Sequence, residues 1–144
     1  MRLRLILALL SVAAPAMAAS SPEGVWLTED RTGVIQIEPC CGKLCGRIVG
    51  QSEPRDAAGQ RPVDRNGVPS CGLVILRGAP AGEAGHYEGL VTDPDDGSVW
   101  HCSFWVAADG TLRLRGYVVL PLFGQTQTWP NFRGHVAADC TITP

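Results

Sequence analysis

The amino-acid sequence predicts an all-β protein, an antiparallel up-and-down barrel of about eight strands. Short apolar-rich runs recur along the chain, and clusters of Gly, Pro and Asp separate them. No stretch after residue 18 shows a sustained helical period. Strands joined by tight turns pair in sequence order, and about eight of them can close into a barrel that holds side chains or one small ligand.

The predicted strands follow one another with mostly short connections. They are the runs 24–28, 34–38, 44–50, 72–76, 86–92, 98–106, 111–119 and 125–129, with short closing segments at 132–136 and 140–142. The clearest part is a meander over residues 86–129, because loops 93–97 and 107–110 both carry Asp and end in Gly. Gly at the end of a tight loop permits the positive φ that a reversal of the chain requires.

Alternation within the run 98–106 indicates a strand with two different faces. Trp100, Cys102, Phe104 and Val106 lie on one face, since successive side chains of a strand point to opposite sides. A longer connection, residues 51–70, is rich in Pro, Asp, Gly and Arg. Loops of this length are often functional, so we expect a ligand to enter at the barrel end that bears this loop.

Residues 1–18 form a predicted secretory signal peptide, which leaves residues 19–144 as one predicted β-barrel domain. Arg2 and Arg4 supply a positive start, residues 5–12 are almost entirely apolar, and a small-x-small cleavage site ends at Ala18. The apolar run is too short to span a membrane, and no later segment is apolar enough to do so. We therefore expect a periplasmic or secreted protein, cleaved near Ala18, without a membrane span in the mature chain.

The charge balance argues against nucleic acid as a partner. The full chain has 12 Lys and Arg residues against 14 Asp and Glu residues. Loss of Arg2 and Arg4 with the signal peptide leaves a net charge near −4. Nucleic-acid-binding domains usually present a basic patch, and this sequence contains no cluster of Lys and Arg.

Short motifs, each weak alone, recur in one order along nearly the whole mature chain. They are Gly24-Val25-Trp26-Leu27-Thr28-Glu29, Cys40 with Leu44-Cys45-Gly46-Arg47-Ile48-Val49, Asp64 with Asn66, Gly72-Leu73 with Ile75-Leu76, Asp93-Pro94 with Asp96-Gly97, Leu112 with Arg115-Gly116-Tyr117, and Gly124 with Thr126-Gln127-Thr128-Trp129. With these motifs the chain resembles the bacterial secreted domain-of-unknown-function family numbered 2147. The resemblance implies a small periplasmic β-barrel similar to lipocalins, in which Trp26 plugs one end, and it implies no established activity.

Six cysteines follow the signal peptide, and an even number in a small exported domain predicts disulfides. The count alone leaves the pairing open. The resemblance implies Cys40–Cys45; Cys102–Cys140 would tie the meander to the tail, and Cys41–Cys71 would remain. We predict three disulfides and no free thiol, with more stabilisation from Cys102–Cys140 than from Cys40–Cys45, because the loop that it closes is longer.

No motif for catalysis or metal binding stands out. The sequence contains no Gly-x-Ser-x-Gly elbow, His-Glu-x-x-His pair or phosphate-binding loop. His86, His101 and His135 lie on three separate segments, and the acidic loop 93–97 lacks the Glu that completes a calcium-binding loop, where Phe104 stands instead. We predict that the protein is not an enzyme and needs no cofactor or metal, with a hydrolase of unrecognised site as a distant third function.

Aromatic residues supply the candidate ligand site. Trp and Tyr pack in cores, but they also line ligand cavities, where an apolar body and a polar tip are both useful. We predict a binding module for a small apolar or lipophilic molecule. Its walls are Trp100, Phe104, Tyr117 and Trp129, with Gln125 as a polar contact.

The alternative function is that of a structural or protein-interaction component of the cell envelope. In that case the barrel would be solid, and a protein partner would bind at the edge near Pro121 or at the loop 51–70. Pro121 favours an edge because proline removes a donor from the strand ladder. Whether the barrel is hollow therefore distinguishes the two functions.

Overall fold

The computed structural model describes residues 15, 18–53 and 55–143. The predicted signal peptide, residues 1–18, lies outside the described residues except for Pro15 and Ala18, so its cleavage stays a prediction. Within the part of the chain that the structure describes, no helix is long and apolar enough to cross a membrane.

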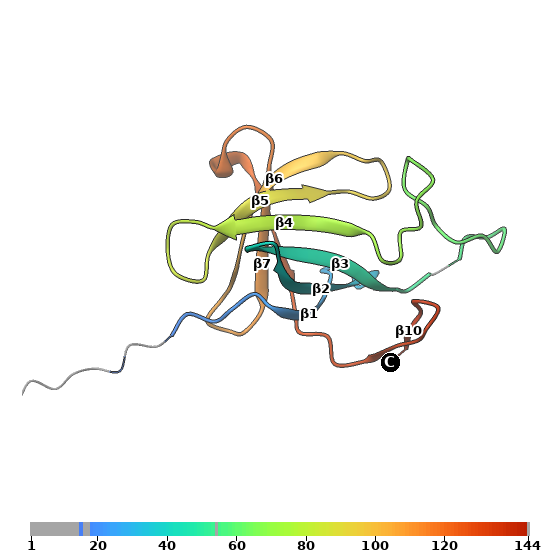
Figure 1. The fold of residues 1–144 in the computed structure, drawn as a ribbon, viewed down its shortest axis with the longest axis horizontal. Helices are drawn as coiled ribbons and strands as arrows, with labels where there is room; N and C mark the ends of the chain where they lie inside the picture. The colour runs from blue at the N-terminus through green and yellow to red at the C-terminus, as the bar shows by residue number, and fades with distance from the viewer. Residues whose placement is uncertain (1–14, 16–17, 54, 144) are drawn as a thin grey trace, which may run out of the picture.

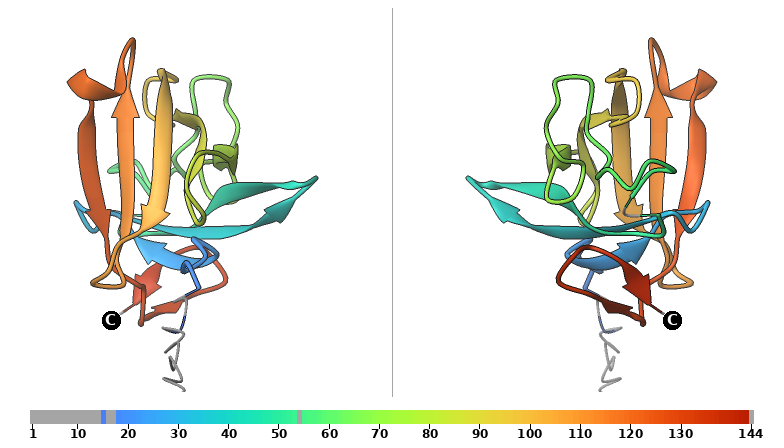
Figure 2. Two further views of the ribbon diagram at one scale, coloured as in Figure 1. Left: turned by 90° about the vertical axis from the view of Figure 1, so that its left-hand side faces the viewer. Right: turned by 90° about the vertical axis from the view of Figure 1, so that its right-hand side faces the viewer.

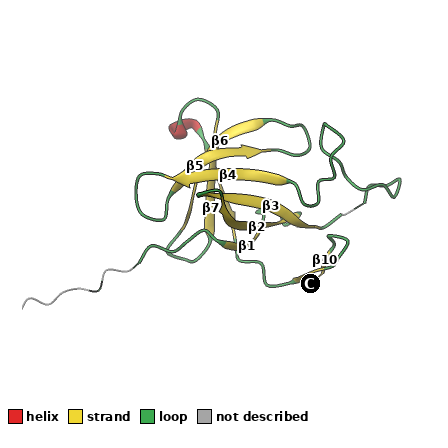
Figure 3. Cartoon of the chain, viewed as in Figure 1, coloured by secondary structure: helices red, strands yellow, loops and turns green. Residues whose placement is uncertain are grey.

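Eight strands form one antiparallel sheet in sequence order (Figure 1). They are β1 (Gly24–Leu27), β2 (Gly33–Cys40), β3 (Lys43–Gln51), β4 (Val74–Pro80), β5 (Tyr87–Thr92), β6 (Val99–Val106), β7 (Leu112–Tyr117) and β8 (Gln125–Trp129). Figure 3 shows strands and loops throughout, apart from the single 3-10 turn η1 (Pro121–Phe123) before β8. The predicted all-β, up-and-down, lipocalin-like barrel of eight strands is confirmed.

The tight turns of the meander form where the sequence predicts them. The Gly97 N–H donates to Asp93 O at 2.8 Å, and the Gly110 N–H donates to Ala107 O at 2.9 Å. Both glycines have positive φ, 74° and 80°. Because this region of φ is strained for residues with a Cβ, Gly closes these hairpins at little cost.

The barrel closes between β1 and the segment that follows β8. The Leu27 N–H donates to Pro130 O, and the Phe132 N–H donates to Val25 O, both at 2.9 Å. Nearby, the Glu29 carboxylate accepts a hydrogen bond of 2.6 Å from the Thr128 backbone N–H. These bonds satisfy backbone groups that an open sheet edge would leave exposed for pairing with another chain.

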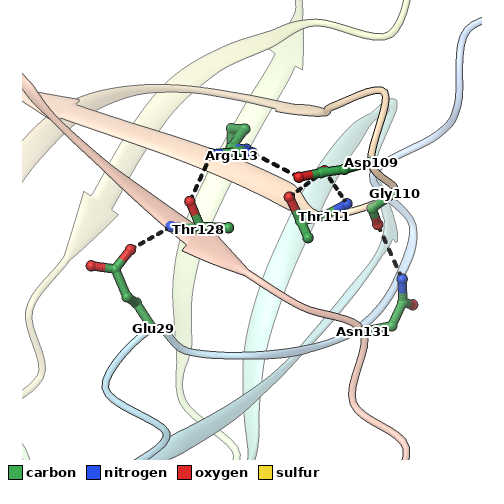
Figure 4. Close-up of polar contacts among 7 residues, drawn as sticks. All are labelled: Glu29, Asp109, Gly110, Thr111, Arg113, Thr128 and Asn131. Atoms are coloured by element: carbon green, nitrogen blue, oxygen red, sulfur yellow. Dashed lines mark hydrogen bonds and ion pairs between the residues drawn. The ribbon is translucent and has the colours of Figure 1, made fainter.

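A cluster of polar side chains ties the turn between β6 and β7 to this closure (Figure 4). Arg113 donates to Asp109 at 2.9 Å and to the Thr128 hydroxyl at 2.8 Å. Thr111 donates to Asp109 through its hydroxyl at 2.7 Å and its N–H at 3.0 Å, and these bonds lower the pKa of the carboxyl. The Asn131 amide donates to the turn at Gly110 O (3.3 Å). The cluster is therefore structural: it fixes the turn between β6 and β7 to β8 and to the segment that closes on β1.

The closed half of the barrel is filled by inward-facing side chains. This core consists of Trp26, Ile35, Ile37, Leu44, Ile48, Leu76, Cys102, Phe104, Leu112, Leu114 and Trp129. The Phe104 ring is fully buried and stacks on Tyr87 with ring centroids 5.4 Å apart. A Cβ on Gly78 would lie 2.4 Å from the Phe104 ring, so the absence of a side chain there makes room for this ring.

A second, smaller group of buried side chains lies between the C-terminal hairpin and the strands β2 and β3. The strands β9 (His135–Val136) and β10 (Ile142–Thr143) form a separate antiparallel hairpin. A shift of register between Val34 and Ile35 lets both side chains become buried. Gly50 permits close packing against the tail hairpin, because a Cβ there would lie 2.9 Å from the Val136 side chain.

The cysteine pairing differs from the prediction in two of three bridges. All six cysteines are described; Cys40–Cys45 forms as the resemblance implies, but Cys140 pairs with Cys71 at a Cα separation of 6.2 Å. Cys41 is exposed and Cys102 is buried, and both are free thiols. Cys102 cannot reach the tail because its side chain points into the core from the inner face of β6. The predicted bridges Cys102–Cys140 and Cys41–Cys71, and the predicted absence of free thiols, are therefore wrong.

Candidate functional site

Four connections meet at one end of the barrel because neighbouring strands run up and down in turn. They are residues 28–32, 52–73, 93–98 and 118–124. Figure 2 shows the longest of them and the turn with η1 at the upper end of the molecule. A cavity of about 880 Å³ lies at this end and is lined by residues from all four connections. It lies at the end that bears the loop 51–70, where the sequence predicts ligand entry.

The floor of the cavity is apolar. Ile35, Ile48, Leu114 and Trp129 line it, and all four belong to the buried core. The Trp129 indole N–H donates to the Gln127 side-chain oxygen at 2.7 Å, so the buried ring keeps its one polar group satisfied. The barrel is thus filled by side chains in its lower half and hollow above this floor.

The inward side chains of β7 and β8 become smaller or polar toward the mouth of the cavity. Gly116 follows Leu114 on the inner face of β7, and a Cβ there would meet no atom closer than the Trp100 Cβ at 4.0 Å. On β8, Gln127 and Gln125 occupy the inner positions above Trp129 and line the cavity. Small and polar side chains at these positions leave a space that large apolar ones would fill.

The charged residues that line the cavity share one sign. Among the described residues that line the cavity, those with charge are acidic: Asp30, Glu53, Asp93 and Asp95. Arg65 lies near this rim without lining the cavity; its positive charge helps to lower the pKa of Asp96, mainly set by hydrogen bonds from Ser98. The mouth therefore presents a negative potential to an approaching ligand.

Asp30 is held in its ionised form by its neighbours in the turn before β2. Partial burial alone would raise its pKa, but hydrogen bonds from Thr28 and Thr32 outweigh this effect and lower it. The Thr28 and Thr32 hydroxyls donate to the same carboxylate oxygen at 2.7 Å and 2.8 Å. The negative charge at this point of the rim thus persists below neutral pH.

Three of the five predicted ligand contacts line the cavity. Trp100 lies at the rim with 41% of its surface exposed, and its indole N–H donates to Ser98 at 3.2 Å. Gln125 lies beside the mouth, and Trp129 forms part of the floor. Their contact with a ligand stays a prediction.

The other two predicted contacts, Phe104 and Tyr117, do not line the cavity. Phe104 lies below the floor in the packed core, where it is fully buried. Tyr117 points outward and stacks on His101, with ring centroids 5.8 Å apart. The alternation that turns Leu112 and Leu114 inward also turns Tyr117 outward. The sequence alone could therefore have shown that Tyr117 does not face the interior of the barrel.

Several lining residues were missed by the sequence reasoning. Gln127 could have been found, since it alternates with Gln125 and Trp129 along one strand. The acidic side chains at the rim could not, because they lie on three connections whose directions depend on the closed barrel. Phe123 of η1 also lines the cavity, although the sequence around it suggested only an interrupted strand.

The histidines do not converge into a second site. His86 stacks on Trp105 with centroids 5.1 Å apart, His101 stacks on Tyr117, and His135 lies in β9. Within residues 18–53 and 55–143, no group of three or more His, Cys, Asp or Glu residues is placed to hold a metal ion. The cavity is therefore the feature on which a functional interpretation can be built.

Comparison with known proteins supports the fold and identifies the family. The structure is similar to that of protein HP1028 from the human pathogen Helicobacter pylori, which belongs to the lipocalin family, with a TM-score of 0.58 over 77% of this chain and 82% of that one. At 14% sequence identity this likeness shows the fold alone. No curated protein matches the sequence. The model of one family matches residues 24–131, and the chain belongs to that family, described as an uncharacterized protein conserved in bacteria (DUF2147).

Proposed function

We propose that this protein is a non-enzymatic binding module that takes the apolar body of a small ligand into the open half of its barrel. The observation that carries the proposal is the cavity of about 880 Å³ with an apolar floor and a polar mouth. Small-molecule sites are typically concave, mostly apolar and about 300–1,000 Å³ in volume, with a few polar groups that orient the ligand. An eight-stranded barrel offers such a space at one end.

The floor defines the end of the ligand that enters first. Ile35, Ile48, Leu114 and Trp129 present hydrocarbon and one aromatic ring, and the indole N–H of Trp129 already has its partner in Gln127. A polar group placed here would lose its hydration without gaining a hydrogen bond, which is costly. The buried end of the ligand is therefore apolar.

The mouth defines the other end. Asp30, Glu53, Asp93 and Asp95 repel a carboxylate or phosphate at the rim and attract a cation. Trp100 offers a partly exposed indole, and an aromatic face attracts a cation within about 6 Å of its centroid. The ligand class that fits is an amphiphile with a neutral or cationic polar end, and Gln125 and Gln127 can donate and accept hydrogen bonds on its way in.

Export is part of the proposal. The predicted leader and two disulfides in a small domain are typical of proteins that fold in an oxidising compartment such as the periplasm. The ligand would then be a molecule of the envelope or of the surroundings of the cell.

Tryptophan fluorescence tests the proposal with three ligands of equal chain length. Decyltrimethylammonium and decanoate, each below its micelle concentration, and decanol, below its solubility limit, share the apolar chain and differ in the charge of the polar end. We expect binding in the order cation, neutral, anion, and a smaller gap between cation and anion in the variant Asp93→Asn/Asp95→Asn.

A cavity-filling variant locates the bound ligand. Gly116→Leu places a side chain into the open space above Leu114 and should weaken binding at least tenfold. Ser103→Leu is the matched control, because Ser103 lies on the outer face of β6 between the inward residues Cys102 and Phe104. Absence of binding by all three ligands, or equal binding by Gly116→Leu and the wild type, would show the proposal wrong.

A further inference from the structure

The connection between β7 and β8 exposes an uninterrupted run of apolar side chains. Residues 118–123, named here the apolar loop, read Val-Val-Leu-Pro-Leu-Phe. The exposed fractions are 63% for Val118, 80% for Val119, 52% for Leu120, 78% for Leu122 and 79% for Phe123. Single exposed apolar residues are common, but a contiguous group of this kind marks an interaction surface.

The apolar loop is held in a defined conformation from below. Arg115 donates from Nε to Pro121 O at 2.7 Å and from a terminal nitrogen to Leu122 O at 3.3 Å. Its other terminal nitrogen donates to the Thr126 hydroxyl at 2.9 Å. One guanidinium thus fixes the turn to β8, and its charge lies at the base of the loop rather than at the tip.

Part of the loop backbone is also hydrogen-bonded within the turn. The Phe123 N–H donates to Leu120 O, and the Gly124 N–H donates to Pro121 O, both at 3.1 Å. Together with the bonds from Arg115, these contacts occupy the carbonyls of Leu120, Pro121 and Leu122. These bonds lower the cost of moving this part of the loop out of water, because an unsatisfied backbone group in an apolar medium is costly.

We propose that the apolar loop docks this protein onto the surface of a lipid bilayer by inserting Leu122 and Phe123 among the headgroups and upper acyl chains. The loop protrudes from the upper end of the barrel (Figure 2), and the side chains of Leu122 and Phe123 are largely exposed. A specific protein interface uses about 20–30 residues a side, far more than this loop provides. Apolar groups inserted a short distance below the headgroups support reversible binding to a membrane surface, and its strength scales with the apolar area that they bury.

The position of the loop connects the membrane to the cavity. Phe123 belongs both to the apolar loop and to the lining of the cavity. Trp100, at the rim, exposes 41% of its surface at the same mouth. A protein docked through this loop would hold its mouth at the lipid surface, where an amphiphile could pass into the barrel without crossing bulk water.

The charges around the mouth determine the kind of membrane. Asp93, Asp95 and Glu53 lie on neighbouring connections and would be repelled by an anionic surface. The nearby cations are already engaged, since Arg65 lies beside Asp96 and Arg115 donates hydrogen bonds to the base of the loop. We therefore expect docking on zwitterionic bilayers, driven by apolar burial and insensitive to salt, in contrast to polybasic surfaces that need anionic lipid.

Vesicle flotation tests the docking without any added ligand, so its outcome is independent of the proposed binding function. The protein is produced from Ala19 onward, which removes the apolar leader; the barrel, its closure and the tail hairpin all lie within residues 19–143. With phosphatidylcholine vesicles, Leu122→Ser/Phe123→Ser should reduce the partition coefficient at least tenfold. The matched control Val63→Ser/Val68→Ser removes two exposed apolar residues from a different loop, 52% and 45% exposed, and should bind as the wild type does.

A second measurement places the loop in the bilayer. The variant Phe123→Trp should show stronger quenching by brominated phosphatidylcholine than the wild type, whose tryptophans lie on strands of the barrel and not in the inserted loop. Four results would overturn the proposal: no binding of the wild type, equal losses in both double variants, binding only to anionic vesicles, or no added quenching. A wild-type dimer that Leu122→Ser/Phe123→Ser converts to a monomer would assign the loop to self-association instead.

Discussion

The two ends of this barrel are built from the same eight strands, yet one is packed and the other is hollow. At the closed end, Phe104 and Leu112 fill the inner positions and are fully buried. Toward the open end, the inner positions of β7 and β8 carry Gly116, Gln125 and Gln127, and a cavity remains. The alternating strand pattern therefore forms the barrel along its whole length. The size of the inward side chains at each depth determines whether the interior is packed or leaves a cavity.

A large aromatic residue removed from the closed end should destabilise the protein more than one removed from the open end. Phe104→Ala removes the centre of the closed core and should lower the free energy of unfolding by about 3–5 kcal/mol, the range for Phe deletions in packed cores. Trp100→Ala, at the open rim, should lower it by less than about 1 kcal/mol, because its ring is already partly in water. Denaturant unfolding measures both, and similar losses would show that the upper half is packed as tightly as the lower half.

The two disulfides should differ as the two ends do. Cys71–Cys140 joins the long open-end connection to the tail across a sequence separation of 69, whereas Cys40–Cys45 spans only 5 at the closed end. Chain-entropy arguments give about 4 kcal/mol for the long loop and about 2 kcal/mol for the short one. Replacing each pair with serine should therefore lower the Tm more for Cys71/Cys140 than for Cys40/Cys45.

Thiol counting is the control for this pairing. Unreduced, denatured protein should show two reactive thiols, Cys41 and Cys102. In the native state Cys41 should react first, since burial raises the pKa of Cys102 to about 12 and keeps it a protonated thiol. A count of zero would mean that a third bridge forms and that the pairing described here is incomplete.

The smallest expected effect compares a carboxylate at each end. The pKa values of Asp30, at the open mouth, and Asp109, in the closed-end turn, are both lowered from 3.8. A lowered pKa in the folded state contributes stability above the unfolded value, and this contribution is lost as pH falls through the folded value. Asp30→Ala and Asp109→Ala should each reduce stability at pH 7, and the difference from the wild type should shrink below about pH 4.

Denaturation midpoints at pH 7 and pH 3 measure this pH dependence. Thr28→Val is an informative companion, because it removes the hydroxyl donor to Asp30 while leaving the carboxylate in place. It should raise the pKa of Asp30 and shift the acid loss of stability to higher pH. An unchanged difference between variant and wild type at the two pH values would contradict the assignment of these carboxylates.

Much of the barrel could be predicted because strands and tight turns depend on local chemistry. The alternation of Trp100, Cys102 and Phe104 predicts one face of β6, and positive φ at Gly97 and Gly110 is the property that turn prediction relies on. The same local rule extends to Gln127, which shares a face with Gln125 and Trp129. These features require only that a strand have two faces and that glycine lack a Cβ.

The depth of each inward side chain along the barrel axis could not be predicted from the sequence. Trp100 and Phe104 share one face of one strand, but Trp100 meets the mouth and Phe104 meets the packed centre, since the register with β5 and β7 sets their height. No local pattern distinguishes these two positions. The sequence could therefore propose an aromatic wall without showing which members touch the cavity.

Local patterns were enough to predict about eight strands, their order and the two tight turns of the meander, because each depends on neighbours along the chain. The pairing of Cys140 with Cys71, the closure of β1 on residues 130–132 and the four acidic side chains at the mouth could be seen only in the closed barrel. These contacts join residues distant in sequence, and their distances follow from the curvature and register of the whole barrel. The residues that line the cavity therefore come together only when the sheet closes into a barrel.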